Sequence, residues 1–331
     1  MFALYLTPEH AGNEVTMLEI SNMSVKFSSY SKGLKRRTVP VIRSLDLSAH
    51  AGEIVAIVGQ SGAGKSLLAH AVLGILPRNS NLSGEIHFKG AELTPKRIRQ
   101  LRGREIALIP QSVSFLNPLL KVGTQIARAG RLNGLSLQKA RETSRKALHR
   151  YGLPPKVSRW FPFQLSGGMT RRVLTATATI GTADLLLADE PTNGLDMQTA
   201  RETLRHLREL ADTGKAVVLI THDIELALEV ADKVSIFCGG VTVEEAHVCD
   251  FSNSVQDMNT GSSGLRHPYS QTLWMALPQN QFTQVALDHG AHLSHKGCTF
   301  NAFCDRADDN CRCNLPRLTP LNSGKVRCWR A

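Results

Sequence analysis

Short apolar runs without alternation recur along the chain, and they end at glycine, proline, acidic or other polar residues. Runs of this kind are typical of parallel strands that are buried on both faces. They occupy residues 54–58, 106–109, 185–188 and 217–220, and two further β-type segments precede them at 18–27 and 41–47. Helical spacing follows the first run, over residues 66–73. The pattern predicts an α/β fold built on a parallel sheet.

The hydrophobic pattern changes character twice, which predicts three regions. Residues 1–16 are unpatterned and are expected to form a leader. Residues 17–250 are expected to form the α/β domain, with a helical insertion at about 119–180 where the spacing is helical and rich in Arg and Lys. From residue 251 to residue 331 the spacing is irregular and cysteines are frequent, so we expect a small C-terminal extension.

The first buried run leads into Gly-x-x-x-x-Gly-Lys-Ser at residues 59–66, and a helix follows. Glycines let backbone N–H groups approach a phosphate, and the helix N-terminus favours negative charge. Lys65 is expected to meet the β- and γ-phosphates, and Ser66 to bind Mg²⁺. The nucleotide-binding residues are predicted to be Gly59, Gln60, Ser61, Gly62, Ala63, Gly64, Lys65, Ser66 and Leu67. This spacing predicts a site for a nucleoside triphosphate.

Two carboxylates, Asp189 and Glu190, follow the buried run at residues 185–188. The first is predicted to hold Mg²⁺, and the second to act as the catalytic base that orients or deprotonates the attacking water. An acidic strand end is common in α/β proteins. Its combination with a phosphate loop is much more specific, and it predicts hydrolysis of a nucleoside triphosphate.

A further set of motifs resembles the ATP-binding subunits of ABC transporters. The segment Leu165-Ser166-Gly167-Gly168-Met169 is similar to the signature peptide of that family and lies between the phosphate loop and the acidic strand. Other motifs of the family are matched by Gln111 (Q-loop), Gly194-Leu195-Asp196 (D-loop) and His222 (switch histidine). The resemblance covers about residues 18–240 and implies a P-loop NTPase core of the RecA-like type with a helical subdomain.

The resemblance implies a head-to-tail dimer, in which the signature of one subunit closes over the nucleotide of the other. The residues that would act on the partner's nucleotide are Ser166, Gly167, Gly168 and Asp196. His222 is expected to contact the γ-phosphate and to hold the attacking water with Glu190. Gln111 is expected to reach Mg²⁺ and to report the nucleotide state to membrane subunits. Adenine is expected to stack on Phe27, with Tyr30 as an alternative and a purely structural Phe27 as another.

Two segments are similar to the oligopeptide, dipeptide and nickel importers within this family. They are residues 111–118, which end in Leu-Asn-Pro, and residues 267–274, which begin with His-Pro-Tyr; Met169 is also usual in that branch. The resemblance implies two transmembrane permease subunits, a second ATPase subunit and an extracytoplasmic solute-binding protein as partners. It places the chain on the cytoplasmic face of the cell membrane, and it leaves peptide and nickel or metal-chelate solutes open.

Five of the seven cysteines lie in the last 34 positions. We expect Cys298, Cys304, Cys311 and Cys328 to form one thiolate site, with Cys313 as the spare. Some peptide-importer ATPases carry a [4Fe–4S] cluster in the segment that this tail resembles. Cysteine spacing alone leaves an Fe–S cluster, a zinc site and reduced structural thiols as alternatives.

The chain has 39 Lys and Arg and 28 Asp and Glu, which gives a net charge of +11. This excess suits a protein that handles nucleoside phosphates beside an anionic membrane. It would also permit a soluble ABC ATPase that acts on nucleic acid or the ribosome. Such proteins usually carry two cassettes or long coiled-coil insertions, and this chain has neither, so we expect no nucleic-acid partner. An inactive regulatory protein is disfavoured because Lys65, Asp189, Glu190 and His222 are all present.

Overall fold

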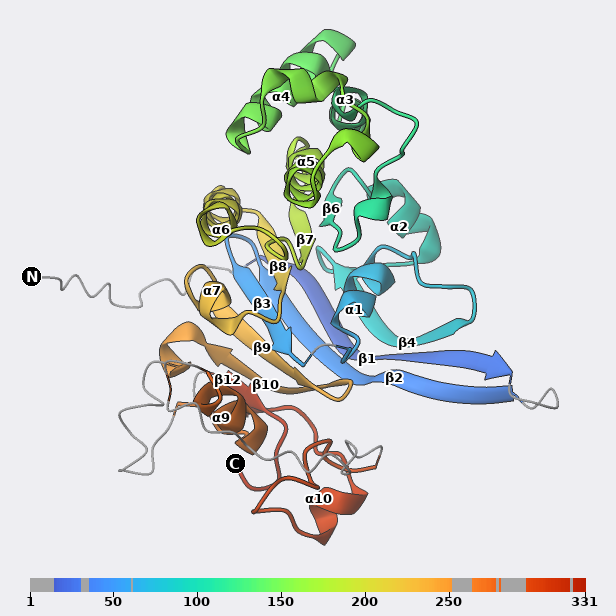
Figure 1. The fold of residues 1–331 in the computed structure, drawn as a ribbon. Helices are drawn as coiled ribbons and strands as arrows, with labels where there is room; N and C mark the ends of the chain where they lie inside the picture. The colour runs from blue at the N-terminus through green and yellow to red at the C-terminus, as the bar shows by residue number, and fades with distance from the viewer. Residues whose placement is uncertain are drawn as a thin grey trace, which may run out of the picture.

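Twelve strands in the described part of the chain form one sheet, which runs through the middle of the molecule (Figure 1). The computed structural model describes residues 15–30, 36–60, 62–251, 264–277, 280, 296–321 and 324–331. The predicted leader therefore lies outside the described residues up to residue 14, and the first strand already begins at Thr16.

The strands and helices alternate through most of the chain. The strands are β1 (Thr16–Tyr30), β2 (Arg36–His50), β3 (Ile54–Gly59), β4 (Ser80–Phe88), β5 (Ala91–Glu92), β6 (Ile106–Ile109), β7 (Leu185–Asp189), β8 (Ala216–Ile220), β9 (Lys233–Cys238), β10 (Val241–His247), β11 (Thr319–Leu321) and β12 (Gly324–Val326). The helices are α1 (Lys65–Val72), α2 (Pro95–Leu101), α3 (Val122–Leu132), α4 (Leu137–Arg150), α5 (Gly167–Thr179), α6 (Met197–Asp212), α7 (Ile224–Leu228), α9 (Pro268–Met275) and α10 (Asp309–Cys313). All the predicted strands are present, and β4, β5, β9, β10, β11 and β12 were not predicted.

The sheet is mixed, with strand order β5-β4-β1-β2-β10-β9-β3-β8-β7-β6 and with β12 added beside β10. Strands β9, β3, β8, β7 and β6 are parallel to one another, and the unbroken apolar runs predicted this for β3, β6, β7 and β8. Strands β1, β2 and β4 form an antiparallel part, which joins the rest through the pair Val241 and Ser44. The carboxyl ends of β3, β7 and β8 therefore lie next to one another at one edge of the sheet.

Side chains of the central strands alternate between two hydrophobic cores. In β3, Val55 and Ile57 belong to a core shared with α1 and the β1–β2 hairpin. Ile54, Ala56 and Val58 belong to a second core, which α6 and α7 cover. Burial on both faces holds β3 inside the sheet, and its parallel pairing with β8 and β9 sets the position of the loop that follows it.

Helices α3, α4 and α5 lie together at one end of the molecule, and α9 and α10 lie at the other end (Figure 1). The first group has its own cluster of buried side chains, drawn from residues 116–176. No helix among the described residues is long and apolar enough to cross a membrane.

The C-terminal tail is joined to the sheet by polar contacts that the irregular sequence pattern did not predict. Strand β12 pairs with β10, and the adjacent Arg327 is buried. Its guanidinium donates to the Thr242 carbonyl at 2.9 Å and pairs with the Asp46 carboxylate at 2.5 Å. Burial is tolerated because the charge is both paired and hydrogen-bonded. The segment of the tail around β12 and Arg327 is therefore anchored to the sheet.

Candidate nucleotide site

The loop between β3 and α1 begins and ends at glycines that no other residue could replace without strain. A Cβ atom on Gly59 would lie 2.0 Å from the Phe237 carbonyl oxygen. Gly64 caps α1 in the left-handed conformation, with φ of 93°. The two glycines let the backbone turn tightly over the start of the helix, where free N–H groups can point at a phosphate. Ser61 lies outside the described residues.

Lys65 is the first residue of α1, and its side chain turns back over the loop. Its ammonium group donates to the carbonyl oxygens of Gly59 at 2.6 Å and Gln60 at 3.1 Å. Burial lowers the pKa of Lys65, while the nearby carboxylates of Glu190 and Asp189 act to raise it. The ammonium group is therefore held close to the backbone of the loop.

Ser66 and Asp189 bring two oxygen ligands together between α1 and β7. The Ser66 hydroxyl donates to the Asp189 carboxylate at 3.0 Å. Burial raises the pKa of Asp189, the Ser66 hydrogen bond lowers it, and the Glu190 carboxylate raises it. A buried carboxylate beside a hydroxyl is a donor set that suits Mg²⁺, whose charge would favour the ionised form.

Glu190 and His222 meet at the ends of β7 and β8. The His222 Nδ1 atom lies 2.8 and 2.9 Å from the two carboxylate oxygens of Glu190. The Glu190 carboxylate is buried, whereas 55% of the His222 side chain is exposed. The Glu190 backbone has φ of 50° and its amide donates to the Ile220 carbonyl at 2.8 Å. Such backbone strain in a non-glycine residue is common at functional sites.

Gln111 and Phe27 take part in none of the hydrogen bonds described above. Gln111 is exposed after β6, and its carbonyl accepts a hydrogen bond from Arg171 at 3.2 Å. Phe27 is half-buried in β1, where it packs against the core that α1 shares. Tyr30 is the last residue of β1, and nothing is described of its side chain. The predicted roles of these residues stay predictions.

The predicted signature forms the start of α5. Ser166 caps this helix, because its hydroxyl accepts the Met169 N–H at 3.3 Å. Ser166 and Gly167 are exposed, and no acidic residue occupies the first turn. A 13-residue helix with a free N-terminus presents a partial positive charge to its surroundings.

The segment that contains Asp196 packs against the signature helix. A Cβ atom on Gly168 would lie 3.6 Å from Leu195, and one on Gly194 would lie 3.6 Å from the Nε of Arg171. Asp196 itself caps α6, accepting the N–H of Thr199 at 3.0 Å and its hydroxyl at 2.7 Å. These hydrogen bonds lower its pKa. Arg171 thus joins the Gln111 and Gly194 segments, a role that sequence reasoning missed.

The four predicted cysteine ligands come from segments that pack together in the extension. The Cys298 amide donates to the Cys311 carbonyl at 2.8 Å. Burial, and then the neighbouring Cys328, Cys311 and Cys304, raises the pKa of the Cys298 thiol to about 11. Among the described residues, no three His, Cys, Asp or Glu side chains are arranged to hold a metal ion.

A phosphate loop on a buried parallel strand, with Ser66–Asp189 and Glu190–His222 beside it, defines a P-loop ATPase. The ABC transporter family model matches residues 42–193. The dipeptide transport ATP-binding protein DppD of Escherichia coli (strain K12) is 33% identical over 326 residues, which are 94% of this chain and 95% of that protein. The oligopeptide transport ATP-binding protein OppD of Haemophilus influenzae (strain ATCC 51907 / DSM 11121 / KW20 / Rd) is 31% identical over 328 residues, 95% of this chain and 97% of that protein.

A solved structure agrees with the sequence relatives. The ATP-binding cassette MJ0796, in a dimeric post-hydrolysis state bound to ADP and Pi, matches with a TM-score of 0.62 and 25% identity. The match covers 70% of this chain and 99% of that one. The chain therefore belongs to the ABC transporter family, as an ATP-binding subunit of the importer type. It is an ATPase that uses ATP and Mg²⁺, and the predicted fold class is confirmed.

Proposed function

We propose that this chain powers the uptake of peptides across the cytoplasmic membrane by hydrolysing ATP on its cytoplasmic face. The proposal rests on the contact between Glu190 and His222 at 2.8 Å, which lies beside the contact between Ser66 and Asp189. It rests also on the similarity of nearly the whole chain to dipeptide and oligopeptide transport proteins. These relatives favour a peptide over nickel or a metal chelate. The related proteins are named for transport, which also disfavours the nucleic-acid alternative.

We assign roles within the site from its geometry. Lys65 and the loop amides hold the phosphates, and Ser66 and Asp189 hold Mg²⁺. Glu190 accepts the proton of the attacking water, and His222 orients that carboxylate and the γ-phosphate. Gln111 links the Mg²⁺ site to the permease, and Phe27 stacks on adenine. We also propose a division of the chain into domains, with boundaries at 16/17 and 250/251 and a helical subdomain at about 119–180.

The complete site requires a second ATPase subunit. Exposure of Ser166 and Gly167 at the N-terminus of α5 leaves an anion-binding end of a helix free for another chain. The dimeric state of the similar cassette MJ0796 supports this assembly. Ser166, Gly167, Gly168 and Asp196 would then act on the nucleotide of the partner.

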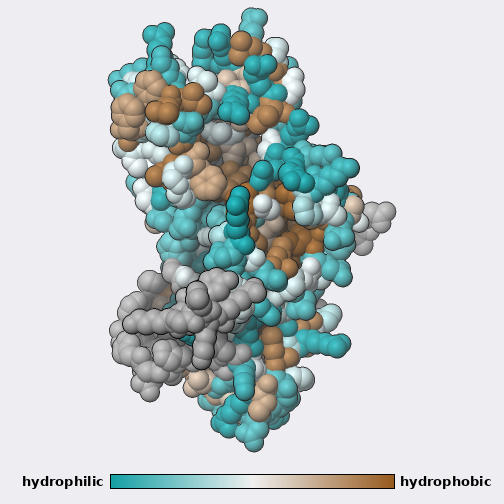
Figure 2. All heavy atoms as spheres, turned by 90° about the vertical axis from the view of Figure 1, so that its right-hand side faces the viewer, coloured by the Kyte–Doolittle hydropathy of each residue, from teal (hydrophilic) through white to brown (hydrophobic). Residues whose placement is uncertain are grey.

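An apolar hollow of about 520 Å³ between the helical end and the sheet supports a permease partner. Figure 2 shows hydrophobic side chains gathered in this hollow. Phe115, one of its lining residues, is 50% exposed, and the neighbouring Leu119 is 81% exposed. Exposed apolar surface of this kind marks protein interaction sites. Its position after Gln111 suits a cytoplasmic segment of the permease, to which an extracytoplasmic binding protein delivers the solute.

The proposed function is tested by purifying the chain together with its permease and measuring ATP hydrolysis by the assembled transporter. We expect the chain, assembled with its permease and solute-binding protein in vesicles, to hydrolyse ATP several-fold faster when a dipeptide or oligopeptide is supplied. Stimulation by Ni²⁺ or a metal chelate, with no response to peptides, would contradict the proposed solute. The Leu119→Asp variant should lose the permease but keep the basal hydrolysis of the isolated subunit.

We also propose that Cys298, Cys304, Cys311 and Cys328 hold a [4Fe–4S] cluster, with zinc as the alternative. Support comes from the packing of these segments around Cys298 and from the soft thiolate chemistry of the set. Binding would release the proton of the Cys298 thiol, whose pKa burial raises.

Anaerobic purification decides between the metals. We expect brown protein with absorbance from thiolate-to-iron charge transfer and about four irons per chain. Cys298→Ser should lose this absorbance, whereas Cys249→Ser, a change at a cysteine outside the extension cluster, should keep it. Bound zinc without iron would select the alternative, and protein free of both metals would leave the cysteines as reduced thiols.

A further inference from the structure

The positive charge of the chain is concentrated in the helical end. Residues 119–180 contain twelve Lys and Arg and a single acidic residue, Glu142. Their net charge of +11 equals that of the whole chain, so the remaining residues are balanced. A field of one sign on one end of a protein attracts anions to that end.

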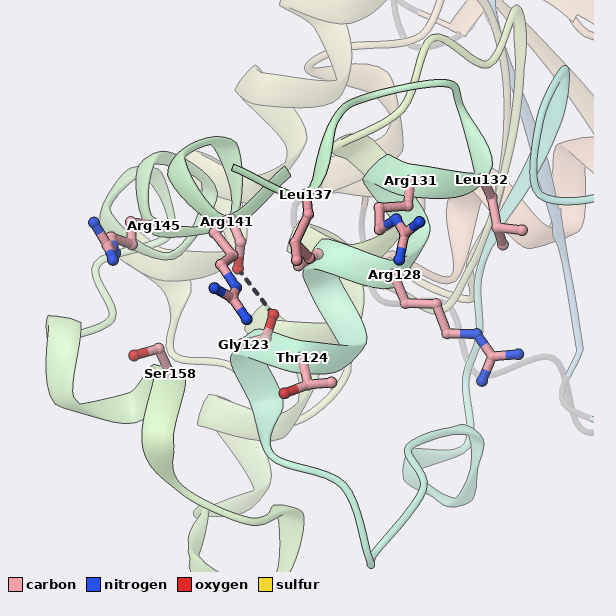
Figure 3. A pocket seen from close by; sticks show the side chains of 11 residues that line it. Gly123, Thr124, Arg128, Arg131, Leu132, Leu137, Arg141, Arg145 and Ser158 are labelled. Carbon is pink, nitrogen blue, oxygen red and sulfur yellow. Dashed lines mark hydrogen bonds between the residues drawn. The ribbon is translucent and has the colours of Figure 1, made fainter. Parts of the chain in front are cut away.

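Four of these arginines border one hollow of about 630 Å³ between α3 and α4 (Figure 3). Arg128 and Arg131 come from α3, and Arg141 and Arg145 come from α4. Small residues also line it, namely Gly123, Thr124, Ser144 and Ser158. Figure 3 shows the Arg141 side chain lying over the first turn of α3, beside Gly123 and Thr124.

Within each helix, the arginines stand about one helical turn apart, although the Arg128 and Arg145 side chains point to opposite sides in Figure 3. Arg141 and Arg145 are four residues apart on one helix, and Arg128 and Arg131 are three apart on the other, spacings at which like charges repel. The only acidic residue of this region, Glu142, pairs with Lys146 at 2.8 Å. None of the ion pairs found among the described residues includes one of the four arginines. Glu142 also interacts with Arg145 through space, but its closest partner is Lys146, so one carboxylate faces several cations here.

We propose that this hollow, which we call the arginine hollow, binds a phosphate-bearing anion. The planar guanidinium fork matches phosphate oxygens in pairs, and it does so better than a lysine ammonium. The first turn of α3 adds the positive end of an 11-residue helix that has no acidic residue there. Leu132 and Leu137 give the hollow an apolar side, and its volume exceeds that of inorganic phosphate. The ligand is therefore an organic phosphate, either free or as a phospholipid headgroup.

The arginine hollow adjoins the apolar hollow that we propose for the permease. Arg128 and Leu132 line both. On that proposed function, a bound phosphate would neutralise Arg128 at the edge of the permease surface and so influence docking. Binding of the phosphate itself is independent of transport, because it requires only residues of α3, α4 and the segment around Ser158.

Binding is measured with the nucleotide site occupied by Mg²⁺ and a non-hydrolysable ATP analogue, so that the phosphate loop cannot take the probe. The free probe is glycerol 3-phosphate, followed by calorimetry, and the lipid probe is vesicles of phosphatidylglycerol, followed by sedimentation. Vesicles of phosphatidylcholine control for uncharged membrane surface. Saturable binding of glycerol 3-phosphate identifies a free ligand, and binding of phosphatidylglycerol vesicles alone identifies a headgroup.

The variant Arg131→Gln/Arg141→Gln should weaken binding of the effective probe by at least about tenfold, since each lost charge-assisted contact is worth about that factor. It should melt at or above the temperature of the parent, because a like-charge repulsion is removed. Arg201→Gln/Arg205→Gln removes the same number of charges from α6, at two exposed positions, and should bind as the parent does. Absence of saturable binding to both probes, or equal losses in the α6 control, would overturn the proposal. Neither outcome bears on ATP hydrolysis or peptide uptake, which are measured separately.

Discussion

The Glu190→Gln variant is expected to hydrolyse ATP roughly 10²–10⁴-fold more slowly than the parent while it still binds ATP. The amide keeps the shape of the side chain, and its oxygen can still accept a hydrogen bond from the His222 Nδ1 atom, which lies 2.8 Å from the carboxylate. It cannot accept the proton of the attacking water. Phosphate release in the steady state measures the loss, and equilibrium binding of a labelled nucleotide measures what is retained.

A matched substitution separates this effect from a change in charge. Glu225→Gln removes one exposed carboxylate from the first turn of α7, a short distance along the chain from His222. Its hydrolysis rate should stay within about twofold of the parent, as is usual for exposed positions away from a site. Parental hydrolysis in Glu190→Gln would show that another group is the base, and loss of ATP binding would show that Glu190 supports the phosphate loop instead.

The parts of the fold that sequence reasoning predicted are those in which burial alone decides the structure. Strands β3, β7 and β8 are buried along their whole length, so their composition indicates them directly. Strand β10 was not predicted, because it buries the polar residue Glu244. That carboxylate accepts the amides of Arg266 and His267 at 2.7 and 3.0 Å, which come from a segment more than 20 positions away. The local pattern of hydrophobic residues contains no information about these distant amides, so it could not predict that Glu244 is buried.

The residues of the site also fall into two groups, those in local motifs and those brought together from distant positions. The phosphate loop and the acidic strand end are local motifs, and their residues meet because adjacent parallel strands end at one edge of the sheet. The contact of Arg171 with the Gln111 carbonyl joins residues 60 positions apart and follows from how α5 packs beside β6. The sequence carried only one signal for Arg171, its position two residues after the signature. The partner half of the site depends on a surface of a second chain, and exposure of Ser166 becomes visible only once α5 is placed.

Ser166→Arg should lower hydrolysis by at least about 10²-fold, while ATP binding to the separated subunit stays unchanged. Ser166 is exposed at the start of α5, so a long side chain there can be accommodated within its own chain. In the proposed dimer the same side chain would enter the space of the partner's γ-phosphate. Rates of phosphate release and nucleotide binding by the isolated subunit together measure the effect.

The substitution also removes a helix cap, whose loss costs about 1 kcal/mol. Ser136 is a matched control, because it caps α4 with the same kind of hydrogen bond, accepted from the Lys139 amide at 3.3 Å. Ser136→Arg should lose similar stability and keep hydrolysis. If Ser166→Arg and Ser136→Arg lost the same amount of activity, the loss would be explained by the missing helix cap and not by the shared site.

Mixing two inactive variants tests the shared site directly. A Lys65→Ala chain has a damaged phosphate loop and an intact signature, and a Ser166→Arg chain has the reverse. In a head-to-tail dimer of the two, one site combines both defects, and the other combines an intact loop with an intact signature. Partial recovery of hydrolysis on mixing is therefore expected if two copies of this chain pair. If the variants stay inactive together yet each recovers with a related ATPase subunit, the natural partner is that related chain, because the signature at Ser166 still acts on a neighbour's nucleotide.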